Sequence, residues 1–364
     1  MEVRVVAKQF YIRPEKRWYE RAFLPMLLLV GCIIVVLVGV GMLACTTAES
    51  QQQTNSTPIE KTPEVAAEKP QLKRSPIHID ALPEAEGITL FSAFDGTSDT
   101  LASEAAAPIE EAIAAFTEQG YETGFVVVDL STGKGIGYNA DTSFFAASTI
   151  KAPYVNYVYQ MLIDSGKIAE ADYLFKDVVI EGTGIMAWDE EYDYELSEVL
   201  ANAITHSDNT GYAMLRENYD SPAWDEWVAN AGVSIEEVIN EWYPYYSTRD
   251  LAKFWVAIKA YLDSGSVNAN HFKTLLSSTD TSFIRTALAS QGTVYSKAGY
   301  EVDADGVDMG ALNEAGIVSG ASGDYLIAVM SDVDYDDEWL TDNELLLINL
   351  IKALDKAHAT VLAA

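Results

Sequence analysis

A run of 23 residues without a charged side chain, residues 22–44, divides this chain into parts that have to fold in different surroundings. A helix of that length is about 34 Å long, enough to cross the ~30 Å hydrocarbon core of a bilayer. The 21 residues before it contain six basic and three acidic side chains. Because basic residues stay on the cytoplasmic side of the first apolar segment, we predict a cytoplasmic leader at 1–21, a single-pass transmembrane signal anchor at 22–44 and an extracytoplasmic chain from residue 45 onward.

Two other interpretations of the run stay open. A lipoprotein signal would be cut before Cys45, which follows a small residue at the end of the run. The segment before Cys32 matches a lipidation box as well, although a cut there would leave an apolar stub. A buried core helix is the third interpretation, but soluble cores seldom need so long a charge-free stretch. Because Cys32 and Cys45 are the only cysteines, the exported part has no disulfide.

Residues 45–86 are polar and contain five of the eleven prolines of the chain. Proline-rich polar segments favour extended backbone and bury little apolar surface. We therefore predict a disordered linker at 45–86. The remaining residues, 87–364, are numerous enough to bury one sizeable core.

The charge balance excludes one large class of partners. The chain has 55 acidic and 23 basic residues, a net charge of −32, whereas a nucleic-acid-binding surface needs clustered cations. Two cysteines and four histidines, without an HExxH or a paired CxxC pattern, leave little material for a metal site. We expect no nucleic-acid partner, no metal and no other cofactor.

The apolar pattern of residues 87–364 predicts both helices and strands, in a defined order along the chain. Apolar spacing, β-branched runs and turn residues predict helices at 108–120, 196–204, 251–262 and 343–358, and strands at 125–128, 293–302, 307–318 and 325–333. In chain order, a helix is followed by strands, then by a long helical middle, by strands again and by a final helix. This order predicts an α+β fold, in which an antiparallel sheet is flanked by helices and carries a helical subdomain.

The first candidate functional motif is Ser148-Thr149-Ile150-Lys151, at the start of a predicted helix. Positions i and i+3 share a helix face, so the hydroxyl and the amine can meet. The positive end of the helix dipole also favours an anionic serine oxygen. Alone, the motif is equally well explained by an exposed serine that caps a helix.

Two further short motifs follow in order. Ser207-Asp208-Asn209 comes just after the helix predicted at 196–204, and each of its residue types is also a good helix N-cap. Lys297-Ala298-Gly299 lies in the strand predicted at 293–302, and a lone KxG pattern arises by chance about once in such a chain.

Together and in this order, the three motifs resemble the SxxK, SDN and KTG motifs of class A β-lactamases and penicillin-binding proteins. The resemblance covers most of residues 105–360 and includes Gly182-Thr183-Gly184. It implies a serine hydrolase that forms an acyl-enzyme with an amide or lactam carbonyl.

The resemblance also implies a role for each motif residue. Ser148 would be the nucleophile, and Lys151 would take or relay its proton. That role needs a neutral amine, which burial and the neighbouring charge of Lys297 would favour. Ser207 would pass the proton to the leaving nitrogen, and Asn209 would hold the substrate amide.

The third motif would bind substrate through Lys297 and Gly299. The backbone N–H groups of Ser148 and Tyr300 would form the oxyanion hole, where one donor is worth about 3–4 kcal/mol elsewhere.

The chain departs from the family pattern at two places. Ala298 replaces the hydroxyl residue of KTG and so removes a hydrogen bond to a substrate carboxylate. No Glu-x-x-Leu-Asn segment, which activates the deacylating water in class A enzymes, lies between Asn209 and residue 251. Glu241 is the candidate replacement, and a solvated loop carboxylate is the other interpretation. Without a base, acylation would proceed while hydrolysis of the acyl-enzyme stalled.

Seven aromatic residues near these motifs are candidates for a substrate groove, although packing accounts for aromatic residues more often. They are Trp188, Tyr192, Tyr194, Trp224, Trp227, Trp242 and Tyr243.

The sequence thus predicts a membrane-tethered, extracytoplasmic serine hydrolase that reacts with a β-lactam or a peptidoglycan peptide. The alternative is a catalytically silent module that binds the cell wall, because Ala298 and the missing segment both reduce activity.

Overall fold

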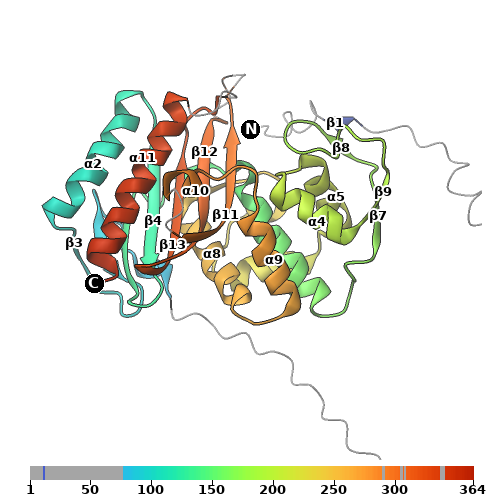
Figure 1. Ribbon diagram of the computed structural model, residues 1–364, viewed down its shortest axis with the longest axis horizontal. Coiled ribbons are helices and arrows are strands. Elements are labelled where there is room, and N and C mark those ends of the chain that lie inside the picture. Colours follow the sequence, from blue (N-terminus) through green and yellow to red (C-terminus); the bar gives the residue numbers. More distant parts are fainter. Residues whose placement is uncertain (1–10, 13–76, 289–291, 304–305, 307–308, 337–340) are drawn as a thin grey trace, which may run out of the picture. The chain divides into compact units, whose positions relative to one another are not determined.

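The computed structural model describes residues 11–12, 77–288, 292–303, 306, 309–336 and 341–364 (Figure 1). The predicted anchor at 22–44 lies outside the described residues, as do most of the leader and of the linker. None of the helices that the structure describes is both long and apolar enough to cross a membrane.

The centre of the fold is a seven-stranded sheet in which every neighbouring pair is antiparallel. Its strands, in spatial order, are β11 (Gly292–Glu301), β12 (Ala311–Gly320), β13 (Gly323–Ser331), β4 (Thr123–Asp129), β5 (Lys134–Tyr138), β2 (Thr89–Ser92) and β3 (Ser98–Thr100). Every residue of β4 is buried, as its Phe-Val-Val-Val run predicts for a strand covered on both faces. Strand β11 lies at one edge of this sheet.

Helices cover both faces of the sheet. Helices α2 (Ser103–Glu118) and α11 (Asp342–Ala357), far apart in the sequence, pack against each other on one face, together with α10 (Phe283–Leu288) (Figure 1). Helix α8 (Thr248–Leu262) packs on β4, β12 and β13. It begins with a capping box of Ser247 and Asp250, in which each side chain accepts a bond from the other's backbone N–H.

A helical part, at the right in Figure 1, lies beside the sheet. It contains α3 (Lys151–Tyr157), η4 (Val158–Ile163), α4 (Leu196–Thr205), α5 (Asn209–Tyr219), α6 (Pro222–Asn230), α7 (Glu236–Asn240) and α9 (Val267–Ser277). The remaining strands are short and form three separate pairs: β7 (Tyr173–Phe175) with β9 (Asp193–Glu195), β6 (Ser143–Phe145) with β10 (Tyr245–Ser247), and β1 (Tyr11–Ile12) with β8 (Val179–Ile180). The short helical segments are η2 (Ile79–Ala81), η3 (Ala147–Ile150) and η5 (His358–Leu362).

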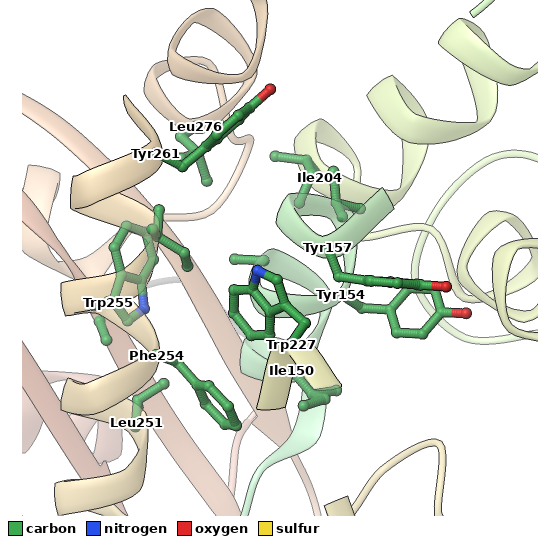
Figure 2. Packing of buried hydrophobic residues seen from close by; sticks show 14 of the residues in the cluster. Ile150, Tyr154, Tyr157, Ile204, Trp227, Leu251, Phe254, Trp255, Tyr261 and Leu276 are labelled. Atoms are coloured by element: carbon green, nitrogen blue, oxygen red, sulfur yellow. The ribbon is translucent and has the colours of Figure 1, made fainter. Parts of the chain in front are cut away.

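The larger hydrophobic cluster joins the helical part to the sheet. In Figure 2, Trp227 of α6 lies between Tyr154 and Tyr157 of α3 on one side and Trp255 of α8 on the other. Ile150 of η3 is fully buried in the same cluster. Burying a large apolar side chain contributes about 1.5–3 kcal/mol, so this packing holds η3 firmly in place.

The α+β fold predicted from the sequence is confirmed. The predicted helices at 251–262 and 343–358 and the strand at 293–302 correspond to α8, α11 and β11 to within three residues at each end. The helix predicted at 108–120 begins earlier, at Ser103, because three alanines before Pro108 already favour a helix.

The start of the folded part differs from the prediction. Residues 77–86 were expected to belong to the disordered linker, but Ile77, Ile79 and Leu82 are buried in the larger cluster. The guanidinium of Arg249 donates hydrogen bonds to the carbonyl oxygens of Ile79 and Leu82, at 3.0 and 2.9 Å. Folded structure therefore extends at least ten residues before the expected boundary, because a long-range contact from α8 fixes a segment whose composition resembles a linker.

Candidate active site

The first motif lies where β6 turns into α3. Ser148 belongs to the tight turn η3, and Lys151 is the first residue of α3. Thr149 fixes the turn, because its hydroxyl donates to the carbonyl oxygen of Ala146 at 2.7 Å and lies 2.6 Å from the hydroxyl of Tyr246. Ala147 has a φ of +45°, a left-handed conformation that costs a residue with a side chain about 1–3 kcal/mol. Strain of this kind, directly before Ser148, is typical of functional turns.

The amine of Lys151 is completely buried and points at the second motif. Its Nζ donates to the carbonyl oxygen of Ser207 and to Oδ1 of Asn209, both at 2.6 Å. None of the hydrogen bonds among the described residues joins this amine to Ser148 Oγ. Burial, followed by the positive charge of Lys297, lowers the pKa of Lys151 well below its usual value.

The second motif is the turn between α4 and α5. Asp208 is the N-cap of α5 and accepts the N–H of Gly211, so the capping explanation holds for this residue. Its other carboxylate oxygen accepts the N–H groups of Ile185 and Met186. Ser207 has a φ of +52° and faces the two lysines instead.

Lys297 reaches the same serine from the sheet edge. Its Nζ donates to Oγ of Ser207 at 2.9 Å and to the carbonyl oxygen of Ala298 at 2.7 Å. Burial lowers the pKa of Lys297 to about 7, although Glu314 and then Asp280 oppose the shift. Ser207 Oγ therefore lies between two buried amines, 2.9 Å from one and 3.5 Å from the other.

Gly299 allows β11 to approach the Ser148 turn. A Cβ atom at this position would lie 2.6 Å from the backbone nitrogen of Thr149 and 2.8 Å from that of Ser148. Both distances are too short for any real side chain, so glycine is required here by contact with backbone. Tyr300 follows on the same strand, and its ring packs against Tyr335.

Asn209 is the most heavily bonded residue of the cluster. Its Oδ1 accepts from Lys151, from the hydroxyl of Tyr243 at 3.0 Å and from the hydroxyl of Thr183 at 3.2 Å. Its Nδ2 donates to the carbonyl oxygen of Glu181 at 3.0 Å. The second amide hydrogen of Asn209 is the one that a substrate carbonyl can use.

Two residues of this cluster were not singled out as site residues in the sequence. Thr183, noted only as part of a Gly-Thr-Gly segment, donates to both Ser207 and Asn209. Tyr243, grouped with the candidate groove aromatics, meets Asn209 beside Lys151. Tyr243 is brought there because β10, which begins two residues later, pairs with β6, and β6 leads into Ser148.

The structure places the two residues that bear on the departures from the family pattern, Ala298 and Glu241. Ala298 is fully buried in a hydrophobic cluster with residues of α10 and α11, so the missing hydroxyl is replaced by core packing. Glu241 is exposed where α7 ends. Of the aromatic candidates, Tyr194, Trp224 and Trp227 are core residues, whereas Trp188 and Tyr192 are exposed.

The model of the beta-lactamase enzyme family matches residues 106–351, a span that includes all three motifs. The chain belongs to the beta-lactamase enzyme family. The family predicted from the motifs is thereby confirmed, and with it the prediction that the protein is a serine hydrolase. No curated protein matches the chain.

Solved structures of this family share the fold. A beta-lactamase from Sphaerobacter thermophilus has a TM-score of 0.59 at 21% identity, over 72% of this chain and 99% of its own. PBP-A has a TM-score of 0.57 at 21% identity, over 69% and 95%. A beta-lactamase from Chitinophaga pinensis has a TM-score of 0.55 at 20% identity, over 70% and 97%.

Proposed function

We propose that this family member is an acylating enzyme, in which Ser148 forms an ester with the carbonyl carbon of a β-lactam or a peptidoglycan-type amide. One observation carries the proposal: Ser207 Oγ lies between two buried lysine amines, one of which follows Ser148 by three residues. A buried amine beside a second cation favours its neutral form and can act as a base.

In the proposed reaction, Lys151 takes the proton of Ser148 Oγ as that oxygen bonds to the substrate carbonyl carbon. The carbon–nitrogen bond of the amide or lactam then breaks. Ser207 gives its hydroxyl proton to the leaving nitrogen and regains one from Lys151. Lys297 remains hydrogen-bonded to Ser207 and offers a charge to an anionic group of the substrate. The N–H groups of Ser148 and Tyr300 would stabilise the oxyanion.

We propose that acylation outpaces deacylation. A general base contributes about 10²–10⁴-fold to hydrolysis, and the carboxylate considered for this role, Glu241, is exposed. A solved mutant of PBP-A is an acyl-enzyme complex with penicillin G, so an acyl-enzyme of this fold can persist. This supports a penicillin-binding or D,D-peptidase-like activity over efficient β-lactam hydrolysis.

The test is intact mass against time for residues 77–364 mixed with penicillin G, with Ser148→Ala as the matched control. The expected result is a mass increase of one penicillin that persists in the wild type and is absent from the variant. An adduct that forms and clears while penicillin is consumed would mean a β-lactamase. A wild type without an adduct would favour the silent wall-binding module.

We also propose that residues 22–44 anchor the protein in the cell membrane with the hydrolase outside the cytoplasm. The charge-free run and its basic leader support this placement. Full-length protein should sediment with membranes, and protease added to intact spheroplasts should digest the hydrolase part. Full protection from the protease would contradict the orientation, and release by alkaline carbonate would contradict the anchor.

A further inference from the structure

Tyr243 is placed beside the Ser148 turn by the backbone around it. β10 begins two residues after Tyr243 and pairs with β6, which leads into the turn. The pairing is extended by one bond, from the N–H of Ala146 to the carbonyl oxygen of Pro244 at 3.0 Å. Tyr243 accordingly packs against the small hydrophobic cluster of Phe145, Ala147 and Ala311, which includes the residue before Ser148.

The side chain of Tyr243 then lies against the Lys151 amine. Its ring centroid is 5.7 Å from Lys151 Nζ, and the ring of Tyr212 lies 5.8 Å from the same atom. The two rings meet edge to face, with centroids 5.5 Å apart. The hydroxyl of Tyr243 donates to Oδ1 of Asn209, the oxygen that also accepts the amine. The rings of Tyr243 and Tyr212 therefore surround the Lys151 amine in place of water. Its hydrogen bonds go to the carbonyl oxygen and Oγ of Ser207 and to Oδ1 of Asn209.

A buried arginine fixes the segment that carries Tyr243. Arg216 on α5 donates to the carbonyl oxygens of Ile239 and Glu241, at 3.2 and 3.1 Å, and to the hydroxyl of Tyr212 at 3.0 Å. That hydroxyl in turn donates to the carbonyl oxygen of Trp242 at 2.9 Å. Three of the carbonyl groups shortly before Tyr243 are thus held from α5, and the position of Tyr243 does not depend on its own hydroxyl alone.

We propose that Tyr243 is a positioning residue that keeps water from the Lys151 amine, so that the amine serves as the base for Ser148 while the acyl-enzyme is protected from hydrolysis. The proposal rests on the acylating function proposed above. It adds a physical reason for slow deacylation that is independent of any missing carboxylate.

The charges around Lys151 agree with this role. Lys297 on β11 disfavours the ammonium form, whereas Asp208, before α5, and Glu301, at the end of β11, favour it. Burial is the largest effect on the pKa of Lys151. The attraction of an aromatic face for a cation is weaker than the hydration that the ring displaces, so the two tyrosines favour the neutral amine overall.

The same geometry bears on deacylation. Hydrolysis needs a water whose oxygen bonds to the acyl carbon as its proton passes to a base, and the base returns that proton to Ser148 Oγ as the acyl bond breaks. Lys151 is the nearest base to Ser148 along the chain, and the Tyr243 ring, 5.7 Å from its Nζ, occupies space from which a water could otherwise reach the amine. Removing the ring would therefore admit the nucleophile as well as hydrate the amine.

The experiment compares Tyr243→Phe, which keeps the ring, with Tyr243→Ser, which removes it. Acylation by penicillin G is followed by intact mass from pH 5 to pH 10. In Tyr243→Ser, hydration should raise the pKa of Lys151 and move the acid limb of the rate upward by about one pH unit or more. The lifetime of its adduct on the plateau should fall about tenfold or more. Tyr243→Phe loses the bond to Asn209 but keeps the ring, so its acid limb and adduct lifetime should change much less than those of Tyr243→Ser.

Tyr173→Ser, the loss of an exposed tyrosine on β7, is the matched control and should match the wild type in both assays. If Tyr243→Ser melts below the assay temperature, Tyr243→Thr loses less packing and carries the same expectations. A ring-less variant with the wild-type acid limb and adduct lifetime would overturn the proposal. A wild type that forms no adduct would overturn the acylating function itself and this inference with it.

Discussion

Two buried polar clusters in this fold treat charge in opposite ways. At the end of β4, burial alone would raise the pKa of Asp129, but hydrogen bonds from Thr132, Ser131 and His358 lower it to about 2. Between β11 and α3, burial lowers the pKa of Lys297 to about 7 and holds the pKa of Lys151 well below its usual value. The first cluster stabilises its charge and the second opposes it.

The difference follows from what each cluster contacts. Asp129 and the fully buried His358 form a hydrogen bond of 2.9 Å, and His358 begins η5, the last element of the chain. Lys134 and Thr132, in the same corner, bond to carbonyl oxygens of residues 364 and 362. The hydrogen bonds of this corner hold the carboxyl-terminal residues in place. The lysine cluster instead lowers the folding stability, because its buried amines are unfavourable when charged, but it provides an amine that can exchange a proton. Strain and unfavourable charge concentrated at one place in a fold are typical of active sites.

The largest expected effect comes from removing the base. Lys151→Met keeps the length of the side chain but cannot accept the proton of Ser148, so the acylation rate should fall about 10²–10⁴-fold. Stability should not fall, because a buried amine with an unfavourable charge is lost. Intact mass after penicillin G measures the rate, and urea unfolding measures the stability. Lys253→Met is the control. The amine of Lys253 forms an ion pair with Asp80 and belongs to none of the three motifs, so this variant should keep the wild-type acylation rate and stability. A fast Lys151→Met would show that another group takes the proton.

A smaller effect is expected at Lys297, and it depends on pH. Because its pKa is about 7, Lys297 loses its charge as the pH rises through neutrality. Acylation by a low concentration of an anionic penicillin should therefore decline above about pH 7. Lys297→Met should remove this alkaline decline and lower the rate at pH 6 by about 10–100-fold, the value of one hydrogen bond to a charged group. An unchanged alkaline limb in the variant would assign the decline to a different residue.

The smallest effect on activity is expected in the other cluster. Asp129→Asn should leave the acylation rate unchanged but lower the free energy of unfolding at pH 7 by about 2 kcal/mol. In the wild type this stabilisation is present above the unfolded pKa of about 4 and is lost as the pH falls toward about 2, because the unfolded state then binds the proton more readily. Urea unfolding between pH 2 and pH 7 measures both. A variant that loses activity but not stability would contradict the division between the clusters.

The motifs were readable from sequence because they are short, local and fixed in order. The hydroxyl, amide and amine groups of Ser148, Asn209 and Lys297 are those that acyl transfer needs, and each lies at the start or inside an element whose apolar pattern is strong. The capping preference of Asp208 was similarly visible. The prediction of an α+β fold rested on the same patterns and is confirmed.

The features that could not be predicted from the sequence depend on contacts between residues far apart in the chain. Tyr243 is brought to Lys151 by the pairing of two three-residue strands, and so short a pairing leaves no periodic pattern. Residues 77–82 resemble a linker until Arg249, far along the chain, bonds to their carbonyl groups. The burial of Ala298 was missed for a related reason, since its position follows from how β11 packs against α10.

The contact of Gly299 with the Ser148 turn has a consequence for how β11 can pair. An edge strand is prone to slip, and a slip of two residues along β12 would keep every side chain on its own face of the sheet. Such a slip would bring Lys297 or Glu301 to the position of Gly299, where even a Cβ atom would lie 2.6 Å from the backbone nitrogen of Thr149. Because Gly299 has no side chain, only the correct register of β11 on β12 lets the strand pack against the Ser148 turn. Gly299 thus helps to determine the strand register.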